Sequence, residues 1–482
     1  MITIFMKRAS VVAGVVDFSS RAKPLLTKLL PIRFLRWAKK LFVMSAMAKM
    51  ESEVNTGQFI RGKHPDGINL IGYIRGETGL GQSCRLVADA LQESEIDFSV
   101  YNYENVSAMR FNDSSWDHKI SDSAQYNINL IHIHPYEMPI AYLRMAKDTW
   151  LNRYNIAFWL WELEEFPEEW INALSLVNEV WTPSEFASNS IRKVTSKPVH
   201  TIPYALRLPM CDSCARDMFN LPSDVFLFLC MFDCNSNFER KNPMGTIAAY
   251  KRAFTVDVKD VGLVIKLNNP QNQEIQAILK ELEGYSNIFI IKDVLEKKHV
   301  NSLISCVDVY VTLHRSEGFG LVPAEAMYLG TPVIATNWSA NTEFMDENVA
   351  CIVDYKYITI QKDTGPFKAG NRWADPDIDQ ASVYMKKLYA NENFRRRVAD
   401  NAKSHIRDRL APERAAALIR DRIAEIYGDA DKESIVREEY NSENDYYGRW
   451  LGHTPLAAEQ DALSQAILKT IRHGQVDFSN DH

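Results

Sequence analysis

The chain has 482 residues, of which 46% are hydrophobic and 24% charged, and its formal net charge is −7. This length exceeds what one hydrophobic core sustains, so we expect two large domains. The acidic balance argues against a nucleic-acid binder, which would be basic overall. The sequence also has no run of about 18 apolar residues that would span a membrane.

The first 60 residues differ from the rest in charge. Residues 1–50 contain ten Lys and Arg side chains against Asp17 alone, interleaved with apolar residues. This composition is typical of a helix on an anionic membrane surface, although a basic helix packed on the protein or a tail would have it too. We therefore treat residues 1–60 as a separate segment. We expect a cytoplasmic protein. If residues 1–60 bind an anionic membrane surface, the protein would lie on the inner face of the membrane.

Residues 61–208 alternate short apolar runs with segments of helical spacing such as Gln82–Leu91 and Glu185–Val194. This alternation predicts a Rossmann-like α/β domain with a parallel sheet. The expected strands are Ile68–Ile74, Phe98–Tyr103, Ile128–Ile133, Ile156–Leu160, Val180–Thr182 and Val199–Tyr204.

A polar linker at residues 209–223 precedes a second α/β pattern over residues 224–410. Residues 411–482 are expected to be helical: one helix over Pro412–Tyr427 that ends at Gly428, a mobile connector, and a last helix over Leu456–Ile471. The expected strands of the second domain are Val225–Met231, Val261–Leu267, Ile288–Ile291, Val307–Leu313, Val333–Thr336 and Cys351–Val353.

Four of the seven cysteines have spacing near that of a zinc ribbon: Cys211, Cys214, Cys230 and Cys234. Cys230 lies inside an apolar run that reads as a buried strand, so a core thiol is the better interpretation. Seven scattered cysteines do not form a disulfide scaffold, and a reducing compartment fits them best.

The segment from Leu313 to Thr336 carries the strongest chemical signal. A strand ends in a loop with Gly318 and Gly320, and a helix begins near Leu321. The free N–H groups and the positive dipole end of such a helix bind anions such as phosphate. Two carboxylates beside a phosphate site would suit sugar hydroxyls better than the phosphate itself.

These two carboxylates, Glu317 and Glu325, stand at the Glu-x7-Glu spacing within Ser316–Leu321, Glu325–Met327 and Gly330–Ala335. In this string the sequence resembles the retaining glycosyltransferases of family four. The resemblance covers roughly residues 67–410. It implies the GT-B fold: two Rossmann-like domains that face each other across a cleft, followed by C-terminal helices.

The resemblance also implies roles for individual residues. Glu317 would contact hydroxyls of the donor sugar and Glu325 the ribose of the nucleotide. The sugar and the distal phosphate would be held around Gly318 by the backbone amides of Phe319, Gly320 and Leu321.

Two adjacent cations, Arg240 and Lys241, follow the first strand of the second domain and would neutralise the departing diphosphate. A further Arg that many family members have is missing, since Asn235 or Ser236 lies at its place. Lys266, near the end of the next strand, is a second candidate for phosphate, and a solvated surface pair is the alternative for Arg240 and Lys241.

The N-terminal domain contributes a glycine-rich loop with Gly79, Leu80 and Gly81, which in the family approaches the donor phosphate when the domains close. His132 and His134 lie at the end of another strand, where relatives have a His beside the donor sugar and acceptor. His134 is nearer the carboxyl end of the strand, so we select His134 for this role. A hydrogen-bonded structural histidine is the alternative. The aromatic and acidic segment Phe158–Pro167 suits either contact with an acceptor or packing between domains.

The resemblance therefore implies a retaining, metal-independent hexosyltransferase without a cofactor. It would use a nucleotide diphosphate sugar carrying mannose, glucose or a deoxyhexose, and a glycan or lipid-linked glycan acceptor, in envelope polysaccharide synthesis. Two alternatives remain: a GT-B scaffold or nucleotide-sugar-binding regulator without activity, and a sugar-nucleotide epimerase of the same fold.

Overall fold

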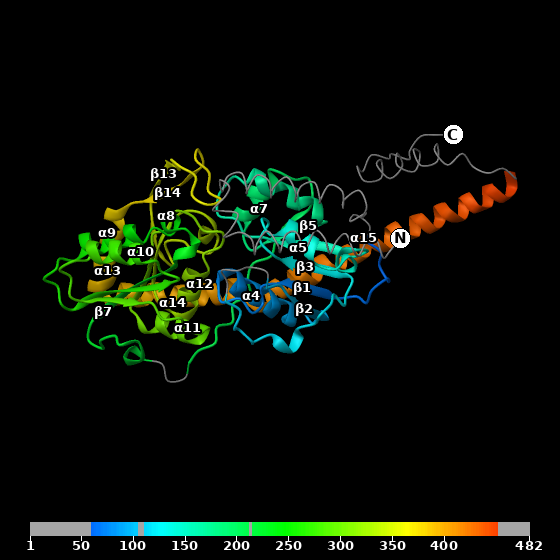
Figure 1. Cartoon of the computed structure of the whole chain (residues 1–482). Coiled ribbons are helices and arrows are strands. Elements are labelled where there is room, and N and C mark those ends of the chain that lie inside the picture. The colour runs from blue at the N-terminus through cyan, green and yellow to red at the C-terminus, as the bar shows by residue number, and fades with distance from the viewer. Residues whose placement is uncertain (1–58, 105–109, 212–214, 452–482) are drawn as a thin grey trace, which may run out of the picture. The chain divides into compact units, whose positions relative to one another are not determined.

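The computed structural model describes residues 59–104, 110–211 and 215–451, and side chains as far as residue 431. The chain separates into two compact units after Arg422. The first unit contains two parallel six-stranded sheets, each with its own helices (Figure 1). Two α/β halves were predicted, and the structure confirms them.

The first sheet has the strand order β2-β1-β3-β4-β5-β6, and all of its neighbouring strands are parallel. All six strands were predicted from their apolar runs, although several end one to three residues earlier than expected. Its helices are α4 (Gly79–Glu93), α5 (Met138–Arg144), α6 (Lys147–Trp150) and α7 (Glu185–Arg192). The strands are β1 (Ile68–Gly72), β2 (Phe98–Asn102), β3 (Ile128–His132), β4 (Tyr154–Phe158), β5 (Glu179–Thr182) and β6 (Val199–Thr201).

The second sheet has the strand order β12-β11-β10-β7-β8-β9 and is also parallel throughout. Its strands are β7 (Phe226–Asp233), β8 (Val261–Asn268), β9 (Ile288–Ile291), β10 (Val309–Thr312), β11 (Val333–Thr336) and β12 (Cys351–Val353).

The helices of the second half pair with one another around this sheet: α9 packs against α13, and α12 packs against α11 and α14. They are α8 (Phe238–Lys241), α9 (Pro243–Ala253), α10 (Asn272–Glu281), α11 (Lys297–Cys306), α12 (Leu321–Leu329), α13 (Ile378–Ala390) and α14 (Glu392–Arg409).

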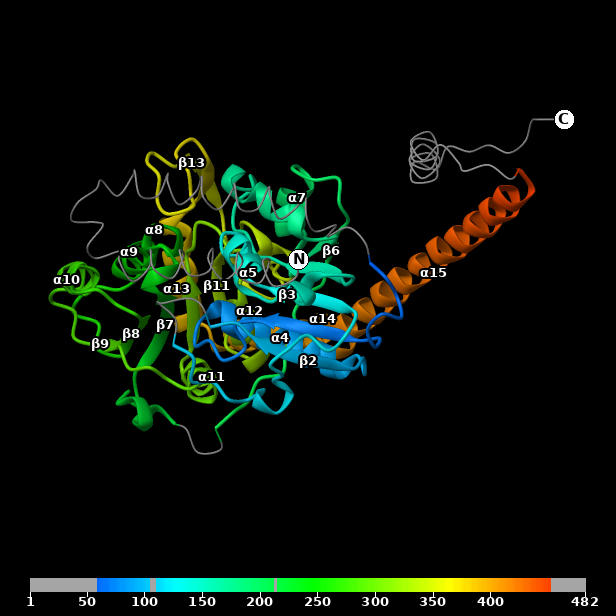
Figure 2. The ribbon, with the colours of Figure 1, turned by 45° about the vertical axis from the view of Figure 1, so that its right-hand side comes forward.

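An antiparallel hairpin of β13 (Tyr355–Thr359) and β14 (Arg372–Pro376) follows β12 and was not predicted. Both views show this yellow hairpin apart from the parallel sheets (Figures 1 and 2). Ile360, Phe367 and Trp373 are buried, and they belong to the hydrophobic cluster of the first half of the chain. The hairpin therefore contributes side chains of the second half to the core of the first.

The prediction for the C-terminal residues was wrong in one respect. Helix α15 runs from Pro412 to Leu451, so it neither ends at Gly428 nor gives way to a connector. A glycine inside a helix costs only about 1 kcal/mol relative to alanine, which does not by itself end a helix. The predicted helix Leu456–Ile471 and the basic residues 1–50 lie outside the described residues.

None of the helices in the described part of the chain combines the length and apolar character needed to cross a bilayer.

Candidate active site

The candidate residues of the second half follow the two strands at which the order of its sheet reverses. Strand β7 lies between β10 and β8, so the connections after β7 and β10 leave the sheet in opposite directions. Ligands of open α/β sheets bind at such a switch point, outside the carboxyl ends of the strands. The loop after β7 carries Arg240 and Lys241, and the loop after β10 carries Glu317, so all three were predicted at the right edge of the sheet.

The loop after β10 leads directly into helix α12. Gly320 precedes the helix with a φ of +91°, and a Cβ there would lie 3.0 Å from the Cβ of Asn341, so this position requires glycine. Since Gly320 has no side chain with which to cap the helix, the first amide groups of α12, beginning at Leu321, can bind an anion. Phe319 is buried and packs edge-on against Tyr204 of the first half.

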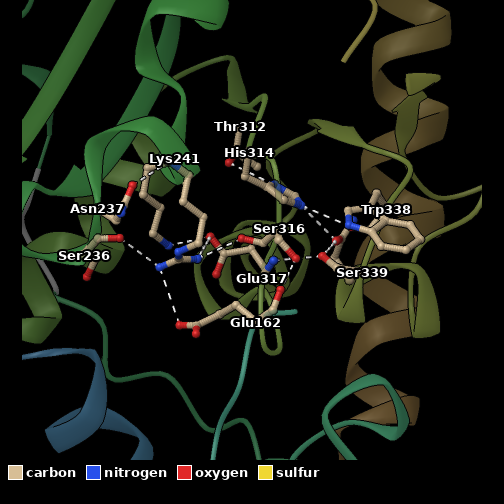
Figure 3. Close-up of polar contacts among 12 residues, drawn as sticks. Glu162, Ser236, Asn237, Lys241, Thr312, His314, Ser316, Glu317, Trp338 and Ser339 are labelled. Atoms are coloured by element: carbon tan, nitrogen blue, oxygen red, sulfur yellow. Dashed lines mark hydrogen bonds and ion pairs between the residues drawn. The ribbon is translucent and has the colours of Figure 1, made fainter. Parts of the chain in front are cut away.

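Glu317 is the electrostatic centre of this loop (Figure 3). Its Oε1 lies 2.5 Å from Lys241 Nζ and 3.5 Å from Arg240 Nη1, and its backbone N–H donates to Ser339 Oγ at 2.8 Å. Burial alone would raise the pKa of Glu317, but Lys241, Arg240 and His314 together lower it to about 2. Glu317 is therefore an anion at any physiological pH, held by two cations.

The two cations differ in accessibility. The Arg240 side chain is only 4% exposed, and its guanidinium donates to Ser316 O at 2.8 Å and to Ser236 O at 3.0 Å. The Lys241 side chain is 22% exposed. Lys241 is consequently the cation that reaches a bound phosphate more easily, whereas Arg240 is enclosed by the two loops that it joins.

The second carboxylate, Glu325, lies one turn inside α12, as predicted, and is 1% exposed. Its Oε1 lies 2.6 Å from Nζ of Lys297, the first residue of α11. Lys297 was not predicted, because nothing in the local sequence around Glu325 indicates which helix packs against α12.

Lys266 lies near the carboxyl end of β8 and is buried. Its ammonium donates to Asn268 Oδ1 at 2.5 Å and to Leu267 O at 3.1 Å. Burial lowers the pKa of Lys266 to about 8. It lies at the same edge of the sheet as Lys241, and its predicted contact with phosphate stays a prediction.

In the first half, the glycine-rich loop leaves β1 at the switch point between β1 and β3. Helix α4 begins at Gly79, three residues before the predicted start, and Thr78 Oγ1 accepts the N–H of Gly81 at 3.4 Å. A Cβ on Gly81 would lie 1.9 Å from Gly76 O, so the loop folds tightly back on the helix. Leu80 packs against the hydrophobic cluster of this half.

The two histidines occupy different environments. His132 is buried, with its Nε2 2.6 Å from Ser83 Oγ and its ring stacked on Phe158. His134 is partly buried, its Nδ1 accepts the N–H of Tyr136 at 3.3 Å, and its ring meets Trp170 edge-on at 4.5 Å. Burial lowers the pKa of either imidazole to about 4, so both are neutral at pH 7. The role of His134 stays a prediction.

The segment Phe158–Pro167, for which either contact with an acceptor or packing between domains was expected, also reaches this site. Ser316 Oγ donates to the backbone oxygen of Glu162, and Ser184 Oγ donates to Gly318 O at 2.7 Å. A Cβ on Gly318 would lie 3.0 Å from Trp161 O. The loop after β4 therefore touches the loop that carries Glu317, so residues of both halves line one site.

The cysteines do not support the zinc interpretation. Cys230 is a buried thiol within β7, as expected, and Cys234 is also free, whereas Cys211 is disulfide-bonded. Cys214 lies outside the described residues. Within the described ranges, no group of three or more His, Cys, Asp and Glu side chains is arranged to hold a metal ion.

Comparison with known sequences gives two matches. Residues 234–405 match the family described as glycosyl transferases group 1. A stretch of 77 residues is 32% identical to the human alpha-1,3/1,6-mannosyltransferase ALG2. This stretch covers 16% of this chain and 18% of that protein. The chain thus spans less than a fifth of the length of this curated relative.

Solved structures of similar fold cover most of the chain. Sucrose-phosphate synthase from Thermosynechococcus elongatus aligns with a TM-score of 0.56 and 14% identity, over 76% of this chain and 100% of its own. OtsA without ligand aligns with a TM-score of 0.51 and 10% identity, over 74% of this chain and 99% of its own. HepE from Anabaena, in complex with UDP and glucose, aligns with a TM-score of 0.50 and 11% identity, over 75% of this chain and 100% of its own. The chain therefore has the predicted GT-B fold.

Proposed function

We propose that this chain, whose residues 234–405 match the group 1 glycosyl transferases, transfers a hexose from a nucleotide diphosphate sugar to a glycan or lipid-linked glycan. The observation that carries the proposal is Glu317, a partly buried anion that two cations hold beside the open N-terminus of α12. A sugar hydroxyl suits the carboxylate, and a diphosphate suits Lys241 and the helix N-terminus.

The chemistry would be carried by charge rather than by a general base. As the bond between C1 of the sugar and the diphosphate breaks, negative charge grows on the leaving oxygens, and Lys241 with the amides of α12 would stabilise it. In the front-face route, the leaving phosphate takes the proton of the acceptor hydroxyl, and the configuration at C1 is retained. Cations of the protein would then do what a metal does in other transferases, so we expect activity without a metal.

The choice of donor rests on relatives. The human relative is named a mannosyltransferase, and the structure of HepE holds UDP and glucose, which favours a hexose on a nucleoside diphosphate. What supports an acceptor in envelope polysaccharide synthesis is the basic, apolar composition of residues 1–50, which suits an anionic membrane surface.

The test begins with thermal shift across nucleoside diphosphates and nucleotide sugars, because a ligand that binds only the folded state raises the melting temperature. The sugar nucleotide that shifts it most is then incubated with EDTA, with and without membrane extract, and nucleoside diphosphate release is measured. We expect acceptor-dependent release that Glu317→Ala abolishes while the protein stays folded. Conversion of the donor sugar without acceptor would instead indicate an epimerase, and an unchanged donor would indicate a scaffold.

A further inference from the structure

The acidic loop that follows β4 brings a second carboxylate to the guanidinium that already faces Glu317. Glu162 Oε1 lies 3.6 Å from Arg240 Nη2, while Glu317 Oε1 lies 3.5 Å from Arg240 Nη1. Figure 3 shows Glu162 and Glu317 as neighbours. Because Arg240 is 4% exposed, solvent screens these interactions weakly.

Backbone contacts rather than its own ion pair fix the position of Glu162. Its carbonyl oxygen accepts the hydroxyl proton of Ser316, and the neighbouring Trp161 donates from Nε1 to Glu165 O at 2.7 Å. The Trp161 ring is 1% exposed and stacks on Phe367 with centroids 5.4 Å apart. The loop is thus preorganised by packing, as a functional side chain requires.

The carboxylate of Glu162 keeps hydrogen-bonding capacity that the fold does not use. Its side chain is 26% exposed, and the 3.6 Å separation from Arg240 is too long for a hydrogen bond. The two terminal nitrogens of Arg240 donate hydrogen bonds to the backbone oxygens of Ser316 and Ser236. A carboxylate at the edge of a site with free lone pairs can accept a substrate hydroxyl.

The balance of charges around the Arg240 guanidinium would change on binding of a donor. Lys241 and Arg240 together balance the charges of Glu317 and Glu162. If a diphosphate draws Lys241 away, one guanidinium remains for two carboxylates, and the surroundings of the sugar become net negative. Negative charge at that point favours the positive charge that develops at C1 as the leaving group departs.

We propose that Glu162 is a further catalytic residue of the transfer, one that accepts a hydrogen bond from the reacting hydroxyl of the acceptor. This inference rests on the proposed function. In the step, the bond between C1 and the diphosphate oxygen breaks, and a bond between C1 and the acceptor oxygen forms. The hydroxyl proton passes to the leaving diphosphate, so Glu162 directs the hydroxyl without keeping its proton.

The test compares Glu162→Gln with Glu165→Gln, a matched change in the same loop at a side chain that is 64% exposed and pairs with Lys193. The assay is the acceptor-dependent release of nucleoside diphosphate described above, from the sugar nucleotide chosen by thermal shift and with membrane extract as the source of acceptor. We expect Glu162→Gln to lower kcat by about 100-fold, which is the loss typical for removing one charged or hydrogen-bonding group that stabilises a transition state. The KM for donor should change less than about twofold, because Glu317 and Lys241 bind the donor. Glu165→Gln should match the wild type.

A purely structural role would give a different pattern. It would lower the melting temperature and move KM together with kcat, and formate would not restore activity. For Glu162→Ala we expect formate to recover part of the rate, since a small carboxylate can occupy the vacated position. Equal rates for Glu162→Gln and wild type, or loss of rate only with loss of fold, would overturn the inference. A wild-type protein that releases nothing from any donor would overturn the proposed function, and the inference with it.

Discussion

The ion pairing of Glu317 predicts how acid destabilises the protein. Its pKa is lowered from 4.5 to about 2 in the folded state. At about 1.4 kcal/mol per unit, this shift contributes roughly 3 kcal/mol to the free energy of unfolding at neutral pH. Because the folded pKa lies below the unfolded one, the contribution is complete above the unfolded pKa and is lost as pH falls toward 2. About 1 kcal/mol of this contribution to the free energy of unfolding is lost by pH 4, and about 2 kcal/mol is lost by pH 3.

Urea unfolding of wild type and Glu317→Gln at pH 6, 4 and 3 measures this contribution. Other titrating groups are common to both proteins, so the difference in free energy between them isolates Glu317. We expect the wild type to lose about 2 kcal/mol more than the variant between pH 6 and pH 3. Glu283→Gln, at an exposed position of the same half, controls for the loss of one carboxylate. If the difference between wild type and Glu317→Gln does not change with pH, the ion pairing described here is wrong.

Three further outcomes follow from the geometry. Gly81→Ala, whose Cβ would meet Gly76 O, should cost about 1–3 kcal/mol of stability by thermal unfolding, whereas Gly79→Ala has open space and should not. Phe367→Ala removes a buried ring and should cost about 3–5 kcal/mol, while Arg372→Met, on the solvent side of the same hairpin, should leave the melting temperature nearly unchanged; equal effects would contradict the packing. If Lys266 binds phosphate, calorimetric affinity for a nucleoside diphosphate should fall as pH rises through about 8 and Lys266→Arg should remove that step; a flat wild-type profile between pH 7 and 9 would exclude the contact.

The sheets could be predicted because their strands are buried on both sides. Runs such as Ile128–His132 and Val261–Asn268 are apolar along most of their length, and burial alone explains why a parallel strand forms there. Strand ends were less certain, because apolar residues such as Ile133 continue into the loops at the carboxyl edge. The hairpin after β12 escaped prediction, since its strands mix charged and aromatic residues without a clear period.

The placement of Glu317 and Glu325 on one strand–loop–helix unit could be predicted for a different reason. Glu317 and Glu325 lie in one strand–loop–helix unit, so their spacing along the chain reports their geometry directly. Lys297 and Glu162 reach the same site from other elements. Their proximity depends on helix packing and on contacts between the halves, which no local pattern in a single sequence encodes.

The hairpin β13–β14 has a consequence for biosynthesis. The hydrophobic cluster of the first half includes Ile360, Phe367 and Trp373, which the ribosome adds more than 150 residues after β6 ends at Thr201. A nascent chain that has just completed the first sheet must therefore keep Trp161 and its neighbours uncovered until the hairpin emerges. The N-terminal half released alone should expose this aromatic surface and aggregate, so the two halves are one folding unit even though each has its own sheet.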